Sequence, residues 1–339
     1  MQLSNETASS PVFLRLNDYM SRQKELSLSS GASLCLIHRD AIVHEWYEGQ
    51  HDRAPGSRRI DADSQFHLAS VRKTYLGFAV SLAIEEGRIA SVDDLAADYL
   101  ADADRSLLAG TTIRHLLTHT HGLQARGIQA RVFPPGTDWS YNNTGLHLLF
   151  RIVGNVFGKP LADVLRERVF EPLGFSQTGW RKERTERLVW MNDDRYDDDH
   201  GADNNMFAST RELAYWGYLH AAKGVVGGKQ IVPSGVFERA AAVTSPEELP
   251  ADRPRNGFIW RVQERPSDIS ELGPSLPAGS YQSLGAYGCA VLVLPSHDAV
   301  AVRMLNQCEK DPPGYDYLAD IRGFGDVVKA ALEYASIIK

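Results

Sequence analysis

Short apolar stretches near both ends of the chain have the length and composition of β-strands. They are residues 33–38, 42–47, 258–260, 290–294 and 299–304. The dipeptide Arg39-Asp40 separates the first two stretches and fits a tight hairpin turn. The last two are separated by residues 295–298, which fit a second turn. The sequence therefore predicts two strand pairs, one near each end of the chain.

Helical patterns fill the middle of the chain. The most apolar of them covers residues 76–86, and Gly87 provides a stop signal. Asn143 is placed to cap an amphipathic helix over residues 144–157, whose apolar positions recur at helical spacing. Further helices are expected at residues 13–20, 112–117, 160–169 and 209–220, with a final helix from about residue 325 to the end.

Together these patterns predict an α/β (α+β) fold. Strands from the two chain ends must pair across the helical insertion if they are to form one sheet. We expect a mixed or antiparallel sheet, covered by the terminal helices and built from residues 10–65 and 245–339. Residues 66–244 are expected to form an inserted, all-helical domain, with the active site between the two domains.

Composition narrows the functions that this fold can carry. The chain has 339 residues, of which 43% are hydrophobic and 23% charged, as is usual for a globular protein. A net charge of −7 gives no electrostatic support for nucleic-acid binding, and no apolar run is long enough to span a membrane. The first residues contain no basic segment followed by an apolar core, so a cytoplasmic location is expected. Cys35, Cys289 and Cys308 are too few and too scattered for a disulfide framework or a zinc site.

Ser70 and Lys73 lie at the start of the most apolar predicted helix. Their spacing places both side chains on one face of a helix. Burial would lower the pKa of the Lys73 amine from about 10.4, so that a neutral amine could take the proton of the Ser70 hydroxyl. The alternative is structural, with Ser70 as a helix cap and Lys73 as a surface residue. The same spacing recurs in residues 21–24 and 336–339, so the motif alone does not decide between these interpretations.

Residues 139–145 contain the only Tyr-x-Asn sequence of the chain. Here Tyr141 could present its hydroxyl to Ser70 and relay a proton to a leaving group. Asn143 could hold Lys73 or a substrate carbonyl through its amide. The structural alternative is a turn with an asparagine helix cap and a tyrosine packed in the core.

A third stretch, residues 280–288, combines glycine and small polar residues just before an apolar strand. Glycine here would let a ligand approach the strand backbone. The N–H group of about Ala286 could then pair with that of Ser70 as an oxyanion hole. The structural alternative is a β-bulge or the start of a hairpin.

The three stretches resemble motifs of the serine β-lactamase and penicillin-binding-protein superfamily, particularly class C β-lactamases and related esterases and amide hydrolases. The resemblance runs from about residue 32 to residue 305, and it includes residues 112–123, residues 170–175 and the order of the motifs. It implies a β-lactamase/transpeptidase-like fold and a serine hydrolase that works through an acyl-enzyme.

The resemblance also implies roles for individual residues. By this likeness Ser70 is the acylated nucleophile, Lys73 its base partner and Tyr141 the second acid/base. The residues that the likeness assigns to substrate and oxyanion binding are Ser70, Asn143, Ser283, Gly285 and Ala286.

One departure from the family pattern bears on the substrate. Where the family usually has Lys-Thr-Gly or His-x-Gly, this chain has Ser283-Leu284-Gly285. The missing cation would normally hold a substrate carboxylate, so its loss favours small esters, or amides that lack the carboxylate. The expected activity is therefore that of a carboxylesterase or amide hydrolase. The alternatives are a β-lactamase or D-Ala-peptidase, and a non-catalytic ligand-binding protein on the same fold.

Neither a cofactor nor a metal is expected. His115, His119 and His121 have a spacing seen in zinc sites, but no glutamate follows the first histidine as in zinc proteases, so we expect structural roles. The acidic residues 191–205 lack the glycine position of an EF-hand and are expected to form a solvated loop at the cleft rim. The predicted partner is a small-molecule ester or amide, with no nucleic acid and no membrane, and the oligomeric state stays open.

Overall fold

A computed structural model describes residues 1, 3–7, 11–124, 130–191, 196–265, 269–307 and 312–338. Its strands are β1 (Ser4–Asn5), β2 (Gly31–His38), β3 (Ala41–Gly49), β4 (Gln65–His67), β5 (Gly179–Trp180), β6 (Leu188–Val189), β7 (Met206–Ser209), β8 (Val225–Val226), β9 (Lys229–Gln230), β10 (Arg261–Val262), β11 (Tyr281–Leu284), β12 (Ala290–Leu294) and β13 (Ala299–Leu305). Its α-helices are α1 (Leu14–Leu26), α2 (Lys73–Glu85), α3 (Ile113–Leu117), α4 (Thr144–Phe157), α5 (Leu161–Leu165), α6 (Glu171–Leu173), α7 (Thr210–Ala221), α8 (Ser234–Ala241) and α9 (Tyr317–Ile338). Shorter helical segments are Pro11–Phe13, Ala69–Arg72, Ala96–Tyr99, Arg166–Phe170 and Pro295–His297.

Seven strands form the main sheet, in the order β1-β3-β2-β13-β12-β11-β10. Every neighbouring pair is antiparallel except β1 with β3. Strand β2 from the N-terminal part pairs with β13 from the C-terminal part, where Cys35 lies opposite Val302. At the turn between β2 and β3, Arg39 and Asp40 have positive φ values of 49° and 63°, which suit the twist of a tight hairpin. The predicted sheet, mainly antiparallel and built from both chain ends, is confirmed.

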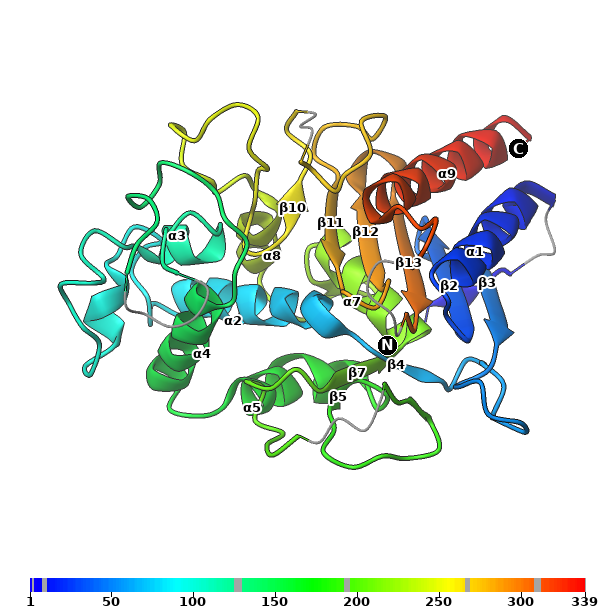
Figure 1. Cartoon of the computed structure of the whole chain (residues 1–339), viewed down its shortest axis with the longest axis horizontal. Coiled ribbons are helices and arrows are strands. Elements are labelled where there is room, and N and C mark those ends of the chain that lie inside the picture. The colour runs from blue at the N-terminus through cyan, green and yellow to red at the C-terminus, as the bar shows by residue number, and fades with distance from the viewer. Residues whose placement is uncertain are drawn as a thin grey trace.

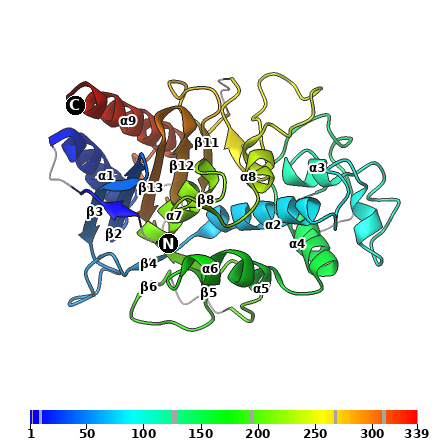
Figure 2. The same cartoon turned by 180° about the vertical axis from the view of Figure 1, so that it is seen from behind.

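Alternate residues of the central strands face opposite sides of this sheet. Leu34 and Leu36 belong to a hydrophobic cluster with α1 and α9, whereas Cys35 and Ile37 belong to the larger core on the other side. Figure 1 shows α1 and α9 together against one face, and Figure 2 shows α7 across the other. The terminal helices therefore cover one face of the sheet, as predicted.

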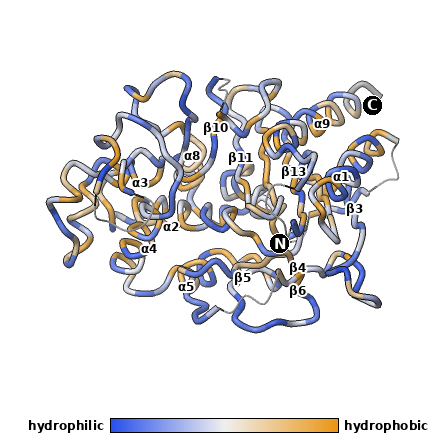
Figure 3. Tube along the Cα trace, in the orientation of Figure 1, coloured by the Kyte–Doolittle hydropathy of each residue, from blue (hydrophilic) through white to orange (hydrophobic). Residues whose placement is uncertain are grey.

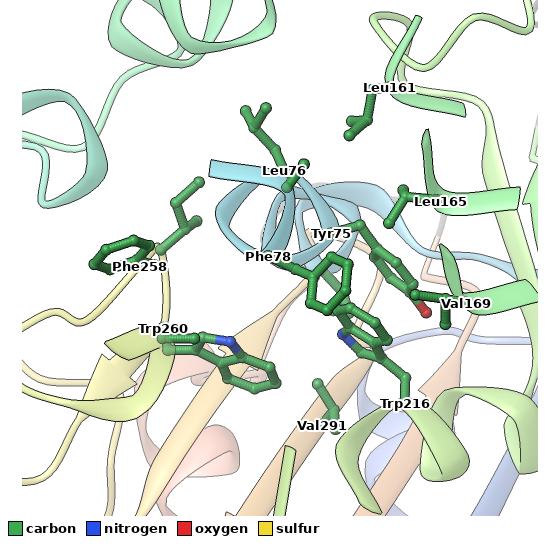
Figure 4. Close-up of a cluster of buried hydrophobic side chains, with 14 of the residues drawn as sticks. Tyr75, Leu76, Phe78, Leu161, Leu165, Val169, Trp216, Phe258, Trp260 and Val291 are labelled. Carbon is green, nitrogen blue, oxygen red and sulfur yellow. The ribbon is translucent and has the colours of Figure 1, made fainter. Parts of the chain in front are cut away.

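Helix α2 lies in the interior of the molecule, between α4 and α8. Its buried residues run without a break from Lys73 to Ala83. Tyr75 of this helix stacks on Trp216 of α7, with ring centroids 4.0 Å apart (Figure 4). Because α7 in turn packs on the main sheet, this stacking ties the start of α2 to the sheet.

The predicted strand over residues 258–260 is wrong. Ile259 has a positive φ of 68°, which lies outside the β region that a β-branched residue adopts in a strand, and the strand β10 begins only at Arg261. The irregular backbone brings the Phe258 carbonyl oxygen against α2, within 2.3 Å of where a Cβ on Gly77 would lie. Close packing against α2 therefore overrides the β-forming composition of this stretch.

The final helix is also longer than the sequence predicts, because it begins at Tyr317 and not near residue 325. Two glycines, Gly323 and Gly325, lie inside the helix. A Cβ on Gly323 would lie 2.8 Å from the Tyr19 hydroxyl oxygen, and one on Gly325 would lie 2.9 Å from Leu276 Cδ1. Both glycines thus allow α9 to pack closely, rather than marking a helix boundary.

The expectation that residues 66–244 are all-helical is wrong, because β5, β6 and β7 lie in this range and form a second sheet with β4, in the order β5-β7-β4-β6. The division into two domains stays a prediction. Buried residues of the sheet and of the inserted helices belong to one hydrophobic cluster, which includes Val291 of β12, Phe78 of α2 and Leu149 of α4.

Hydrophobic positions gather on the packed elements and hydrophilic positions on the outer loops (Figure 3). Within the described ranges, no helix combines the length and the apolar character that crossing a bilayer requires.

Candidate active site

Ser70 lies in a 3-10 turn between strand β4 and helix α2. Just before the turn, the Leu68 N–H donates to the Met206 carbonyl of β7 at 2.9 Å. Ala69 has a positive φ of 46°, and its N–H donates to His67 Nδ1 at 3.0 Å. These contacts turn the chain sharply from strand to helix. Ser70 is therefore at the start of the helix, as predicted, but in a 3-10 turn and not in the first α-helical turn.

Lys73 is the first residue of α2, and only 4% of its surface is exposed. Its Nζ donates to Asn143 Oδ1 at 2.9 Å and to the Tyr141 hydroxyl. Burial, reinforced by the guanidinium groups of Arg72 and Arg261, lowers the Lys73 pKa to about 7. At neutral pH a substantial fraction of this amine is therefore uncharged.

The Tyr141 hydroxyl lies between Lys73 and Ser70. It accepts from Lys73 Nζ and donates to Ser70 Oγ at 2.9 Å. No direct hydrogen bond joins Ser70 to Lys73 within the part of the chain that the structure describes, so the tyrosine connects them. Burial raises the Tyr141 pKa, while the hydrogen bond to Ser70 and the charge of Arg261 act in the opposite direction. The side chain also forms part of a cavity wall and keeps 45% of its surface exposed.

Asn143 immediately precedes α4, but its side chain points to Lys73 and makes no helix-capping hydrogen bond. The neighbouring Asn142 supplies one, since its Oδ1 accepts from the Thr144 N–H at 3.0 Å. The expectation that the Asn143 side chain caps this helix is therefore wrong. The other expectation, an amide that holds Lys73, matches the observed bond.

The third predicted stretch lies on strand β11 and on the turn that follows it. Ser283, Gly285 and Ala286 all line the same cavity as Ser70. A Cβ on Gly285 would lie 2.5 Å from the Leu68 carbonyl oxygen, so the end of β11 packs directly on the turn that carries Ser70. The Gly285 N–H already donates to the carbonyl of Cys289 at 2.8 Å.

Two backbone N–H groups at this cavity remain for a ligand. Neither that of Ser70 nor that of Ala286 has an acceptor among the residues that the structure describes. Paired N–H groups of this kind can stabilise an oxyanion that develops on a carbonyl oxygen.

The cavity has a volume of about 500 Å³ and is lined from distant parts of the chain. Sequence reasoning missed much of its wall, including Trp139, Asn256, Arg261, Glu271, Tyr287 and Tyr317. Trp139 and Tyr287 lie within stretches that the sequence singles out, but no role was expected for them. The others come from the edge strand β10, from loops and from the first residue of α9, and their positions depend on contacts between distant segments.

The three histidines lie in the same region of the fold. His119 packs beside Tyr141, with ring centroids 4.7 Å apart. It is 2% exposed, and burial together with the charge of Arg261 holds its pKa well below the ordinary value, so the ring is neutral at pH 7. His121 accepts a backbone N–H at Nδ1, and His115 completes a capping box at the start of α3. In the described ranges, no cluster of three His, Cys, Asp or Glu side chains could hold a metal ion.

Two sequence-based expectations fall partly or wholly on residues that the structure does not describe. Asp193 and Asp194 of the acidic segment lie outside the described residues, as does Cys308. The described part of the acidic segment, residues 196–205, has no helix and no strand. Closure of this segment over a ligand stays untested.

Comparison with known proteins identifies the family. The Beta-lactamase family model matches residues 22–322. The chain therefore belongs to the Beta-lactamase family, and that membership indicates a hydrolase.

Three relatives illustrate the range of similarity. An uncharacterized protein of Alkalihalophilus pseudofirmus is 43% identical over 322 residues, which cover 92% of this chain and 94% of that protein. Esterase EstB of Burkholderia gladioli is 28% identical over 195 residues, which cover 47% of this chain and 49% of the esterase. The crystal structure of a penicillin-binding protein homolog from Caulobacter crescentus has a TM-score of 0.76 and 17% identity, and the match covers 98% of this chain and all of that one. This likeness confirms the predicted β-lactamase/transpeptidase-like fold.

Proposed function

We propose that this protein is a serine hydrolase that cleaves small esters or amides through an acyl-enzyme on Ser70. The observation that carries the proposal is the hydrogen-bonded chain from Ser70 through Tyr141 to the buried Lys73, at the wall of a cavity. The backbone N–H groups of Ser70 and Ala286, which have no acceptor among the described residues, support acyl transfer. The similarity to EstB, which is named an esterase, supports the same class of reaction over about half of the chain.

The protonation state of Lys73 sets the direction of the proposed proton relay. A charged Lys73 can only donate to Tyr141, whose hydroxyl then donates to Ser70, as the observed bonds run. When Lys73 is neutral its lone pair can accept, so both hydroxyl groups can turn and the Ser70 proton can point toward Tyr141. Since the Lys73 pKa lies at about 7, both states exist near neutral pH.

In acylation, Ser70 Oγ bonds to the substrate carbonyl carbon while its proton passes through Tyr141 to Lys73. The carbonyl π bond opens to an oxyanion, which the N–H groups of Ser70 and Ala286 stabilise. The Lys73 ammonium then returns the proton through Tyr141 to the leaving oxygen or nitrogen, as the bond from the carbonyl carbon to the leaving group breaks.

Deacylation uses the same path with water as the nucleophile. The water oxygen bonds to the acyl carbon and one of its protons goes to Lys73. The bond from the acyl carbon to Ser70 Oγ then breaks, and the proton returns to that oxygen. The products are the free acid and the original enzyme.

Parallel assays of the wild type and Ser70→Ala with p-nitrophenyl acetate and nitrocefin test this proposal. We expect the wild type to hydrolyse the ester faster than nitrocefin, and Ser70→Ala to lose at least about 1,000-fold in rate. Ester hydrolysis by Ser70→Ala at the wild-type rate would overturn the mechanism. Faster nitrocefin turnover would favour a β-lactamase instead, and absence of both turnover and covalent adduct would favour a ligand-binding protein.

A further inference from the structure

The cavity contains a buried cation that the sequence-based argument about the substrate did not include. Arg261 lies on the edge strand β10, opposite Gln282 of β11, and only 8% of its surface is exposed. Its guanidinium carbon lies 4.4 Å from the centroid of the Trp139 ring and 5.8 Å from that of Tyr141. Arg261 therefore faces the aromatic wall that carries the proposed proton relay.

A hydrogen-bonded frame holds this guanidinium in place. Arg261 Nε donates to Glu271 Oε2 at 2.9 Å, and Nη1 donates to Asn256 Oδ1 at 3.3 Å. Glu271 Oε1 accepts from the Tyr317 hydroxyl at 3.1 Å, and Asn256 Oδ1 accepts from the Trp139 indole N–H at 3.1 Å. The frame connects segments from both sides of the cavity, so the arginine is preorganised before any ligand arrives.

One end of the guanidinium remains free to bind a ligand. Arg261 Nη2 donates to no residue in the part of the chain that the structure describes, and Arg261 lines the cavity. Both oxygens of Glu271 already accept hydrogen bonds within the frame. The group left without a partner in this frame is therefore a hydrogen-bond donor, the Nη2 group of Arg261. An arginine binds a carboxylate more strongly than it binds a neutral acceptor.

We propose that Arg261 is a specificity-determining residue that binds a carboxylate of the substrate; this inference rests on the hydrolase function proposed above. The Tyr141 ring lies between this arginine and the nucleophile, with its hydroxyl 2.9 Å from Ser70 Oγ and its centroid 5.8 Å from the Arg261 guanidinium carbon. A carboxylate that is separated from the scissile carbonyl by a few methylene groups can span that ring. The substrate class is therefore a monoester or monoamide with a carboxylate at this spacing.

This inference replaces the expectation of a substrate without a carboxylate. That expectation considered only β11, where Ser283 stands in place of the cation usual in the family. Arg261 supplies a cation from the adjacent strand β10, which pairs with β11 in the sheet. A purely structural Arg261–Glu271 ion pair is the competing explanation, and it predicts changes in stability without changes in substrate preference.

Two matched substrate pairs separate these explanations. The first pair, p-nitrophenyl glutarate and p-nitrophenyl pentanoate, places the carboxylate on the acyl side. The second pair, 3-carboxyphenyl acetate and phenyl acetate, places it on the leaving-group side. Arg261→Gln removes the charge and Arg261→Lys keeps it without the planar fork. Arg253→Gln is the control, because Arg253 pairs with Asp138 and does not line the cavity.

We expect the wild type to prefer the carboxylated member of one pair through a lower KM. The assays are run at pH 9, where the Lys73 amine is neutral with or without the nearby charge of Arg261. Arg261→Gln should then lose about 10- to 100-fold in kcat/KM for that substrate, as expected for a lost hydrogen bond to a charged group, and change less than about 3-fold for the neutral member. The kcat/KM of Arg261→Lys for the carboxylated substrate should lie between those of the wild type and Arg261→Gln. Arg253→Gln should match the wild type on both substrates.

An unchanged preference in Arg261→Gln for both pairs would overturn the inference. If Arg261→Gln does not fold, the inference is tested by comparing inhibition by glutarate in Arg261→Lys and in the wild type. We expect glutarate to compete with the ester and to bind Arg261→Lys more weakly, whereas equal or absent inhibition would count against the proposal. If ester turnover is lost in Ser70→Ala but substrate preference is unchanged in the Arg261 variants, only this inference fails and the proposed function stands. Failure of every ester to acylate Ser70 would remove the proposed function together with it.

Discussion

The hydroxyl oxygen of Tyr141 lies 2.9 Å from Ser70 Oγ and accepts a hydrogen bond from Lys73 Nζ. The spacing of Ser70 and Lys73 in the sequence suggested direct contact, but the tyrosine stands between them. Any proton that passes between nucleophile and amine in this arrangement therefore passes through the Tyr141 oxygen. The tyrosine hydroxyl thus becomes the most informative single group to remove.

Tyr141→Phe removes that hydroxyl and keeps the ring that packs against His119. We expect kcat on a p-nitrophenyl ester to fall by about 100- to 10,000-fold, as is typical for loss of an acid/base group, with little change in the melting temperature. Tyr334→Phe on α9 is the control, because Tyr334 is 55% exposed. A Tyr141→Phe enzyme that keeps more than about half of the wild-type kcat would argue against the relay.

Activity should rise with pH through about pH 7, because protonated Lys73 cannot accept a proton and its pKa lies at about 7. Below that pH, kcat/KM should fall as the neutral amine disappears. Asn143→Asp places a carboxylate next to Lys73 Nζ, which should raise the Lys73 pKa by about 1 to 3 units and move the rise in activity to higher pH.

Asn155→Asp on the same helix provides the matched control for the pH profile, because Asn155 is exposed and bonds to the Tyr99 carbonyl, away from Lys73. Its profile should follow that of the wild type. Identical profiles for Asn143→Asp and the wild type, measured from pH 5 to pH 10, would show that Lys73 does not control the rate.

The sequence predicted correctly those features that depend on residues close together in the chain. Ser70 and Lys73 lie three positions apart on one helical start, so their proximity follows from helix geometry alone. The hairpin at Arg39 and Asp40 follows in the same way from a short turn between two apolar stretches. Pairing of the two chain ends was also predictable, since the terminal strands had no other partners for one sheet.

The sequence failed where long-range contacts decide the structure. Ile259 has a β-forming composition around it, yet packing against α2 gives it a positive φ. Arg261 and Glu271 carry no motif, and their place in the cavity depends on how an edge strand and a loop meet Trp139. Glycines inside α9 suggest a helix boundary in the sequence because their packing partners lie elsewhere in the chain.

Gly285→Ala tests the contact between β11 and the turn that carries Ser70. The new Cβ would lie 2.5 Å from the Leu68 carbonyl oxygen, so the strand or the turn must shift. We expect a loss of about 1–3 kcal/mol in the free energy of unfolding and at least about a 10-fold loss in kcat/KM. Urea unfolding and the ester assay measure the two effects.

Gly154→Ala in α4 is the control, since nothing lies within 4 Å of the position that its new methyl group would take, and alanine favours a helix interior by about 0.5–1 kcal/mol. It should leave activity unchanged and stability equal or higher. Equal activity of Gly285→Ala and the wild type would show that the catalytic turn does not depend on this close approach.

Asp320→Ala tests how α9 is held on the sheet. The Arg303 and Asp320 side chains are 0% and 1% exposed and form two bonds, of 2.6 and 2.7 Å. Removing the carboxylate leaves a buried guanidinium without its partner, which should cost about 3–5 kcal/mol in the free energy of unfolding. Glu333→Ala, which removes the partner of Lys329 on the surface of α9, should cost less than about 0.5 kcal/mol in the same urea titration. Equal losses of unfolding free energy in Asp320→Ala and Glu333→Ala would contradict the claim that the buried ion pair holds α9 on the sheet.

The central claim is that substrate becomes covalently attached to Ser70, and peptide mapping by mass spectrometry tests it most directly. The protein is treated with a fluorophosphonate probe and, separately, with an activated ester at pH 8. The account predicts a mass increase on the peptide that contains Ser70 in the wild type, and no adduct in Ser70→Ala. An adduct on another residue, or ester turnover with Ser70 unmodified, would contradict it.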